Sequence, residues 1–109
     1  MSVPTIIDTD PGVDDAVALM LAAASSELQL LAVTTVFGNA GVEVSTANAL
    51  RLRALAGLGD LPVAVGAARP LVYPWAQRTD SWHGSDGLGG APTCCPNPSD
   101  RSSSAARWL

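Results

Sequence analysis

The sequence contains no lysine, few aromatic residues and two cysteines. All six basic residues are arginines, against ten acids, so the formal net charge is −4. A nucleic-acid partner needs clustered lysine and arginine to neutralise its phosphates, so we expect none here. Aromatic residues make up only 5% of the chain, and the 48% apolar fraction depends heavily on alanine. Large core side chains are therefore scarce.

Signals for membrane insertion and secretion are also missing. The longest unbroken apolar run, residues 16–24, has nine residues, whereas a membrane-spanning helix needs about 20. Residues 1–4 carry no basic region, so we expect neither a signal peptide nor a membrane partner. Cys94 and Cys95 are adjacent, and a disulfide between neighbours is strained. We expect free thiols and a cytoplasmic location.

Short apolar runs alternate with helical patterns through the first two thirds of the chain. Strands are predicted at residues 5–7, 28–37 and 62–65, and helices at residues 13–24 and 45–56. The strands are continuous apolar runs, which favours burial on both faces. The order β-α-β-α-β therefore predicts an α/β fold with a parallel, Rossmann-like sheet and right-handed crossovers.

The last third of the chain has little apolar periodicity. It contains a glycine-rich segment, residues 83–90, and then three prolines and a serine run within residues 92–109. We expect residues 1–91 to form the folded part and residues 92–109 an irregular tail. The glycine-rich segment is not a phosphate loop, because no predicted strand leads into it and no Gly-Lys-Ser follows.

Four of the ten acids lie within eight residues, directly after the first predicted strand. They are Asp8, Asp10, Asp14 and Asp15. Like charges at 4 Å repel by about 1 kcal/mol in water and by more when partly buried, whereas a helix N-terminus stabilises one carboxylate by about 0.3–1 kcal/mol. A divalent cation would neutralise the others, and all-oxygen ligands favour Ca²⁺ or Mg²⁺. The alternative is that Asp14 is a helix N-cap among solvated acids.

Ligands of parallel sheets bind outside the carboxyl ends of the strands. Residues 8–15, residues 38–39 and the loop from Gly66 follow the three predicted strands, so we expect them to converge on one crevice. Taken alone, Asn39 is equally well explained as a turn residue. His83 taken alone is more often a structural or solvated loop histidine than a catalytic one.

Together these motifs resemble the inosine/uridine-preferring nucleoside hydrolases, the N-ribohydrolases of nucleoside salvage. The run Asp-Thr-Asp-Pro-Gly-Val-Asp-Asp-Ala at residues 8–16 is similar to the N-terminal signature of that family. The similarity continues in the family's order through residues 34–39, 48–51, 62–67 and 83–89. It covers residues 5–90, and the aspartate signature is its most specific part.

The resemblance implies calcium-dependent hydrolysis of the N-glycosidic bond of ribonucleosides to ribose and free base. In that family Asp10 and Asp15 would be calcium ligands, and Asp10 would also be the general base for the attacking water. Asp8 would support the cluster from behind. Such hydrolysis passes through an oxocarbenium-like state, which nearby carboxylates stabilise.

The resemblance also implies the contacts to the small-molecule nucleoside substrate. Asp14 would bind a ribose hydroxyl, and Asn39 would contact the ribose close to the metal. His83 would be a catalytic residue near the ribose and the nucleobase. Family members are commonly dimers or tetramers, so a homo-oligomer is implied for the full-length protein.

Family members are about three times as long as this chain, and they take a third calcium ligand and the leaving-group residues from a downstream region. We therefore expect an N-terminal portion of the domain that is inactive by itself. Two alternatives remain open. One is a Mg²⁺-dependent phosphatase of haloacid dehalogenase type with Asp8 as nucleophile beside Asp10. The other is a non-catalytic, degenerate fragment.

Overall fold

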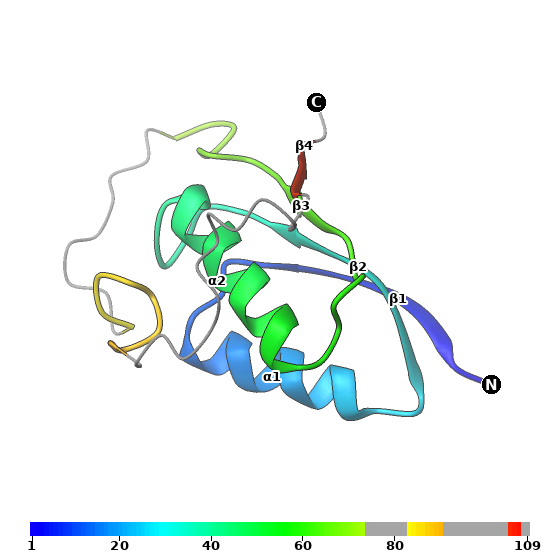
Figure 1. Ribbon diagram of the computed structural model, residues 1–109. Coiled ribbons are helices and arrows are strands. Elements are labelled where there is room, and N and C mark those ends of the chain that lie inside the picture. The colour runs from blue at the N-terminus through cyan, green and yellow to red at the C-terminus, as the bar shows by residue number, and fades with distance from the viewer. Residues whose placement is uncertain (74–82, 91–104, 108–109) are drawn as a thin grey trace.

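The computed structural model describes residues 1–73, 83–90 and 105–107 (Figure 1). Strands and helices alternate along the chain. Their bounds are β1 (Val3–Thr9), α1 (Val13–Ala24), β2 (Leu28–Thr35), α2 (Val42–Leu55), β3 (Val63–Val65) and β4 (Ala105–Arg107). The predicted β-α-β-α-β order is confirmed over the first five elements. None of the described helices is long and apolar enough to cross a membrane.

The described strands form one parallel sheet in the order β1-β2-β3-β4. The register pairs Asp8 with Thr34 and Thr9 with Thr35, so the polar ends of β1 and β2 lie side by side. β4 pairs with β3 over three residues and is a strand that periodicity did not predict. Of the tail predicted at residues 92–109, residues 92–104 and 108–109 lie outside the described residues.

Both helices begin after a glycine. α1 has its predicted bounds; Gly12 is its N-cap, and its first turn carries two acids that favour the positive end of the helix dipole. α2 begins at Val42 after Gly41, three residues earlier than predicted. β-Branched residues in its first turn obscured the helical period. α2 ends before Gly57, whose φ of 70° suits glycine at that position.

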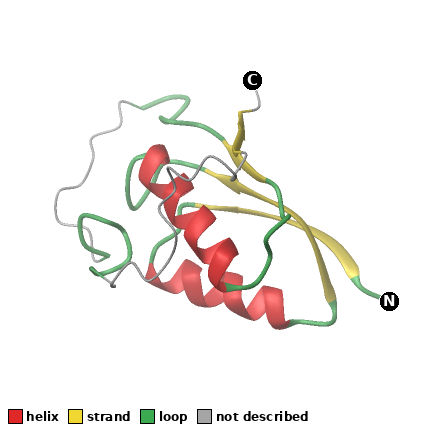
Figure 2. Cartoon of the chain, in the orientation of Figure 1, coloured by secondary structure: helices red, strands yellow, loops and turns green. Residues whose placement is uncertain are grey.

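The core lies between the helices and one face of the sheet (Figure 2). It joins α1 to α2, β2 and β3 through a cluster of buried apolar side chains. They are Leu19, Val33, Ala49, Leu52 and Val63. Both crossovers run in the same direction along the sheet, so right-handed connections place both helices on the same face. The expectation that both faces are buried is wrong for β1, where Ile6 is 60% exposed.

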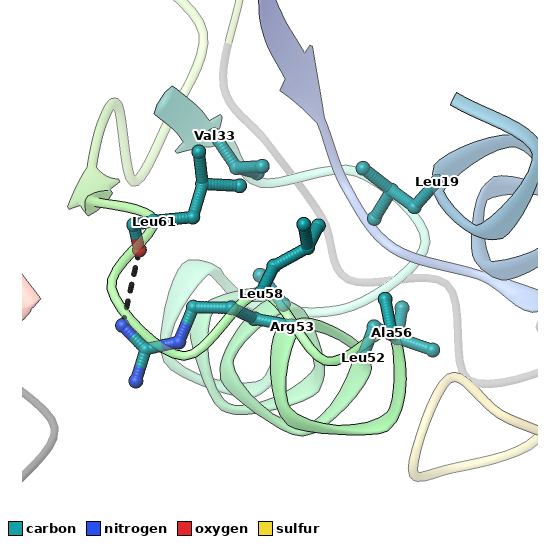
Figure 3. Close-up of a pocket in the computed structure, with 8 residues that line it drawn as sticks. Leu19, Val33, Leu52, Arg53, Ala56, Leu58 and Leu61 are labelled. Carbon is teal, nitrogen blue, oxygen red and sulfur yellow. Dashed lines mark hydrogen bonds between the residues drawn. The ribbon is translucent and has the colours of Figure 1, made fainter. Parts of the chain in front are cut away.

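A small apolar pocket lies where the last turn of α2 meets the core (Figure 3). Leu58 and Leu61 line it from the loop before β3, and Leu19 lines it from α1. The Arg53 stem closes one side, and its Nη1 donates a hydrogen bond to the Leu61 carbonyl at 3.1 Å. This bond ties the end of α2 to the loop that leads into β3.

The uneven burial of β1 gives a first prediction. Ile7 packs against the core cluster, whereas Ile6 points to the exposed side. We expect Ile7→Thr to lower the free energy of unfolding by roughly 1–2 kcal/mol. Ile6→Thr, the matched control one residue away, should change it by less than about 0.5 kcal/mol. Urea denaturation measures both, and equal losses would contradict a one-sided core.

Candidate active site

The acidic turn, residues 8–15, closes back on itself through the Asp15 carboxylate. The Thr9 hydroxyl donates to Asp15 Oδ1 at 2.8 Å, and the Gly12 N–H donates to Asp15 Oδ2 at 3.0 Å. Asp15 is thus the third residue of α1 and returns to the backbone of the N-cap, as in a capping box. The alternative that Asp14 is the N-cap is wrong, because Gly12 holds that position.

Asp10 and Asn39 join the ends of β1 and β2. The Asn39 N–H donates to Asp10 Oδ2 at 2.7 Å, and Asn39 Nδ2 donates to the Asp10 carbonyl at 3.3 Å. The Phe37 N–H donates to the Ala67 carbonyl at 3.0 Å, which brings in the loop after β3. These contacts bring the three segments together at the carboxyl ends of the strands, as predicted. That they line one crevice stays a prediction.

Gly38 makes the close approach of Asp10 possible. A Cβ built on Gly38 would overlap the Asp10 carboxylate, with the carboxyl carbon 2.7 Å away. No side chain larger than hydrogen fits there unless Asp10 moves. Sequence reasoning missed this role because a glycine after a strand is typical of any turn.

His83 comes to the N-terminus of α1 from the glycine-rich segment. The Val13 N–H donates to His83 Nδ1 at 3.1 Å, and His83 Nε2 lies 3.6 Å from Asp14 Oδ1. Because Nδ1 accepts a hydrogen bond, the proton of the neutral imidazole sits on Nε2 and faces Asp14. The His83 side chain is 19% exposed and that of Asp14 is 82% exposed. Asp14 is therefore open to a ligand.

Gly12 lies where these contacts converge. A Cβ on Gly12 would be 2.9 Å from Asn39 Nδ2 and 3.0 Å from the His83 ring. The structure therefore brings Asp10, Asn39, Asp14 and His83 around one turn. The Asp8 carboxylate instead accepts a hydrogen bond from the Thr34 hydroxyl at 2.6 Å. Its supporting role stays a prediction.

The described side chains include the type of ligand that a divalent cation needs, but too few of them lie together. Asp10 and Asp15 offer hard carboxylate oxygens within one turn, which suit Ca²⁺ or Mg²⁺. Among the residues that the structure describes, however, no three His, Cys, Asp or Glu side chains are placed to hold a metal ion. The described part thus offers two carboxylates of a suitable kind.

The glycine-rich segment is held by Asp86. Its carboxylate accepts hydrogen bonds from the N–H groups of Leu88 and Gly90, each at 3.1 Å. The Gly89 N–H donates to the His83 carbonyl at 2.6 Å and closes the turn behind the histidine. These bonds fix the segment that carries His83.

The Asp86 contacts predict a pH dependence of this segment. The N–H groups of Gly90 and then Leu88 favour the charged form and lower the pKa of Asp86. A lowered pKa stabilises the fold above the unfolded value of about 3.9, and this contribution is lost as the pH falls through the folded pKa. The ¹³Cγ signal of Asp86 should titrate lower in the folded chain than in urea. Equal midpoints would contradict this assignment.

The fold is shared with solved nucleoside hydrolases. The sequence profile described as inosine-uridine preferring nucleoside hydrolase matches residues 5–108, and the chain belongs to this family. The match runs past residue 90, where the resemblance was expected to end. This membership replaces the phosphatase alternative.

Curated relatives and solved structures agree with this assignment. Uridine nucleosidase 1 of Arabidopsis thaliana is 43% identical over 95% of this chain and 31% of its own length. The pyrimidine-specific ribonucleoside hydrolase RihA of Photobacterium profundum is 52% identical over 83% of this chain and 29% of its own. An inosine-guanosine nucleoside hydrolase structure superposes with a TM-score of 0.77 at 37% identity, covering 96% of this chain and 31% of that one. The chain spans about a third of the length of these relatives.

Proposed function

We propose that this chain carries the metal- and ribose-binding part of an active site that hydrolyses the N-glycosidic bond of ribonucleosides. The observation that carries this proposal is the pairing of Asp10 with Asn39 beside Asp15, at the carboxyl ends of β1 and β2. The relatives named above include enzymes for pyrimidine and for purine nucleosides. The proposal therefore extends to ribonucleosides as a class.

Asp10 is the residue proposed as general base. The Asn39 N–H donates to its Oδ2 at 2.7 Å, so the carboxylate has one fixed orientation at the carboxyl end of β1. From there it would accept the proton of the water that attacks the anomeric carbon. Asp14, 82% exposed, would accept a hydrogen bond from a ribose hydroxyl, and Asn39 would contact the same sugar. The carboxylates stabilise the positive charge that develops on the ribose.

Calcium is the proposed cofactor, in a family that depends on a metal ion. Asp10 and Asp15 would hold it, and both supply the oxygen donors that calcium prefers. When bound, the ion supplies positive charge that orients vicinal hydroxyls and favours deprotonation of the attacking water. Further ligands would come from outside the described residues.

His83 is proposed to act beside the sugar and the base. Its Nε2 lies 3.6 Å from Asp14 Oδ1, so the ring and the carboxylate would meet the same sugar. The Val13 N–H holds the other ring nitrogen at 3.1 Å, which keeps the ring from rotating. We expect the 109-residue chain to place these groups but not to release ribose, because it spans about a third of the length of its curated relatives.

Two measurements test the proposal. Titration calorimetry with Ca²⁺ should show binding by the 109-residue chain, and a reducing-sugar assay with uridine and with inosine should show no ribose release. Joining the chain to the downstream two thirds of the Arabidopsis relative should then give calcium-dependent ribose release. If neither the 109-residue chain nor the joined protein binds Ca²⁺, the metal assignment is wrong.

A further inference from the structure

Asn48 is a buried polar side chain that the mechanism above does not use. It lies on α2 and is 0% exposed. Its Nδ2 donates to the Asp86 carbonyl at 2.8 Å and to the Pro11 carbonyl at 3.3 Å. Its Oδ1 accepts a hydrogen bond from Arg51 at 3.3 Å. One amide group therefore connects the helix, the acidic turn and the glycine-rich segment.

The chemistry of these contacts selects asparagine. A side-chain amide has two N–H donors on one nitrogen, and here each meets a backbone carbonyl from a different segment. A carboxylate of the same shape has no donor and would place one of its oxygens against both carbonyls. The amide oxygen is meanwhile used by Arg51, which fixes its orientation.

Gly87, in the glycine-rich segment, lets the backbone approach the Asn48 amide closely. A Cβ on Gly87 would lie 3.0 Å from Asn48 Nδ2 and 3.4 Å from the Pro11 carbonyl, and Gly87 has a φ of 74°. Both the space and the backbone conformation therefore require glycine at this position. The glycine-rich segment comes as close to Asn48 as its backbone allows.

We propose that Asn48 is the positioning residue that sets His83 against the N-terminus of α1. Asp86 is three residues from His83, and the bond from the Gly89 N–H to the His83 carbonyl closes the segment around it. Anchoring the Asp86 carbonyl therefore places the imidazole beside the Val13 N–H. The same amide bonds the Pro11 carbonyl, two residues before Val13. Asn48 therefore positions both the Val13 N–H and the His83 ring that accepts its hydrogen bond. The importance of this arrangement for ribose binding rests on the proposed function, but the arrangement itself does not.

His83 is the single histidine of the chain, so its ring gives an unambiguous signal. In ¹⁵N-histidine-labelled protein at a pH where the ring is neutral, long-range ¹H–¹⁵N correlation distinguishes the two tautomers. We expect the folded 109-residue chain to show the Nε2–H tautomer, as the Val13 contact requires. In Asn48→Asp we expect averaged tautomer signals and at least about tenfold faster amide exchange at Val13.

Two further variants keep the test sharp. Thr46→Val is the control, because Thr46 is also buried on α2 but bonds to Thr35 and Val42, away from the segment of His83. It should alter stability and leave the tautomer unchanged. If Asn48→Asp does not fold, Asn48→Ser removes the amide without adding charge and should give the same release of His83.

The possible outcomes separate this proposal from the proposed function. An Nε2–H tautomer and Val13 exchange that persist in Asn48→Asp or Asn48→Ser would overturn the positioning role. So would loss of the tautomer in Thr46→Val to the same degree, because that would make the effect one of general stability. Neither calcium nor nucleoside is present in these measurements. A failure of calcium binding therefore overturns the proposed function and leaves this inference standing.

Discussion

Asp15→Asn should weaken Ca²⁺ binding by at least about 100-fold, since it removes one of the two proposed carboxylate ligands. The same carboxylate accepts hydrogen bonds from the Thr9 hydroxyl and the Gly12 N–H. An asparagine in this place has one acceptor oxygen and cannot serve both donors equally. We therefore also expect a loss of about 1 kcal/mol in the free energy of unfolding, from the weakened cap.

Calorimetry with Ca²⁺ and urea denaturation measure these two effects separately. Asp60→Asn is the matched control, because Asp60 is an exposed acid in the turn before β3 and the substitution changes the net charge equally. It should leave Ca²⁺ affinity within about twofold, since an exposed charge away from the ion is largely screened. Equal calcium affinity in Asp15→Asn and the unsubstituted chain would show that Asp15 is not a ligand.

Gly38→Ala is expected to have the second largest effect. The new methyl group would overlap the Asp10 carboxylate, so either Asp10 or the loop after β2 must move. Such overpacking costs about 1–3 kcal/mol of stability. Because Asp10 would leave the position in which Asn39 holds it, we expect Ca²⁺ affinity to fall at least about tenfold as well.

A control glycine and a double variant test whether the clash with Asp10 causes the loss of stability in Gly38→Ala. Gly59 has no atom within 4 Å of an added Cβ, so Gly59→Ala should be neutral or should stabilise by up to about 1 kcal/mol. In an Asp10→Gly background the cost of Gly38→Ala should largely disappear, because the clashing carboxylate is gone. A cost that stays the same in that background would place the strain elsewhere.

The order of the elements could be predicted from the sequence because each one has a local signature. α1 was predicted with its observed bounds, since an acidic first turn and an alanine-rich run define it. β1 extends from Val3 to Thr9, beyond the predicted residues 5–7, because polar Asp8 and Thr9 pair with β2. That pairing, like the pairing of β4 with β3, joins distant residues and leaves no local pattern.

Some residues of the candidate site could likewise be found from the sequence, and others could not. Asp10, Asp14 and Asp15 could be found because four like charges in eight residues require an explanation. Gly38 and Asn48 could not, since each looks ordinary in its own segment. Gly38 matters through Asp10, and Asn48 matters through Asp86, 38 residues further along the chain. Their contributions exist only once the fold has brought those segments together.

The hydrogen bonds at the start of α1 have one more consequence. The free N–H groups at a helix N-terminus are a common binding place for phosphate groups. In this chain the Gly12 N–H is taken by Asp15 and the Val13 N–H by His83. A phosphate that reached this end of α1 would meet carboxylates where it needs donors. The proposed active site would therefore favour a neutral nucleoside over the corresponding nucleotide.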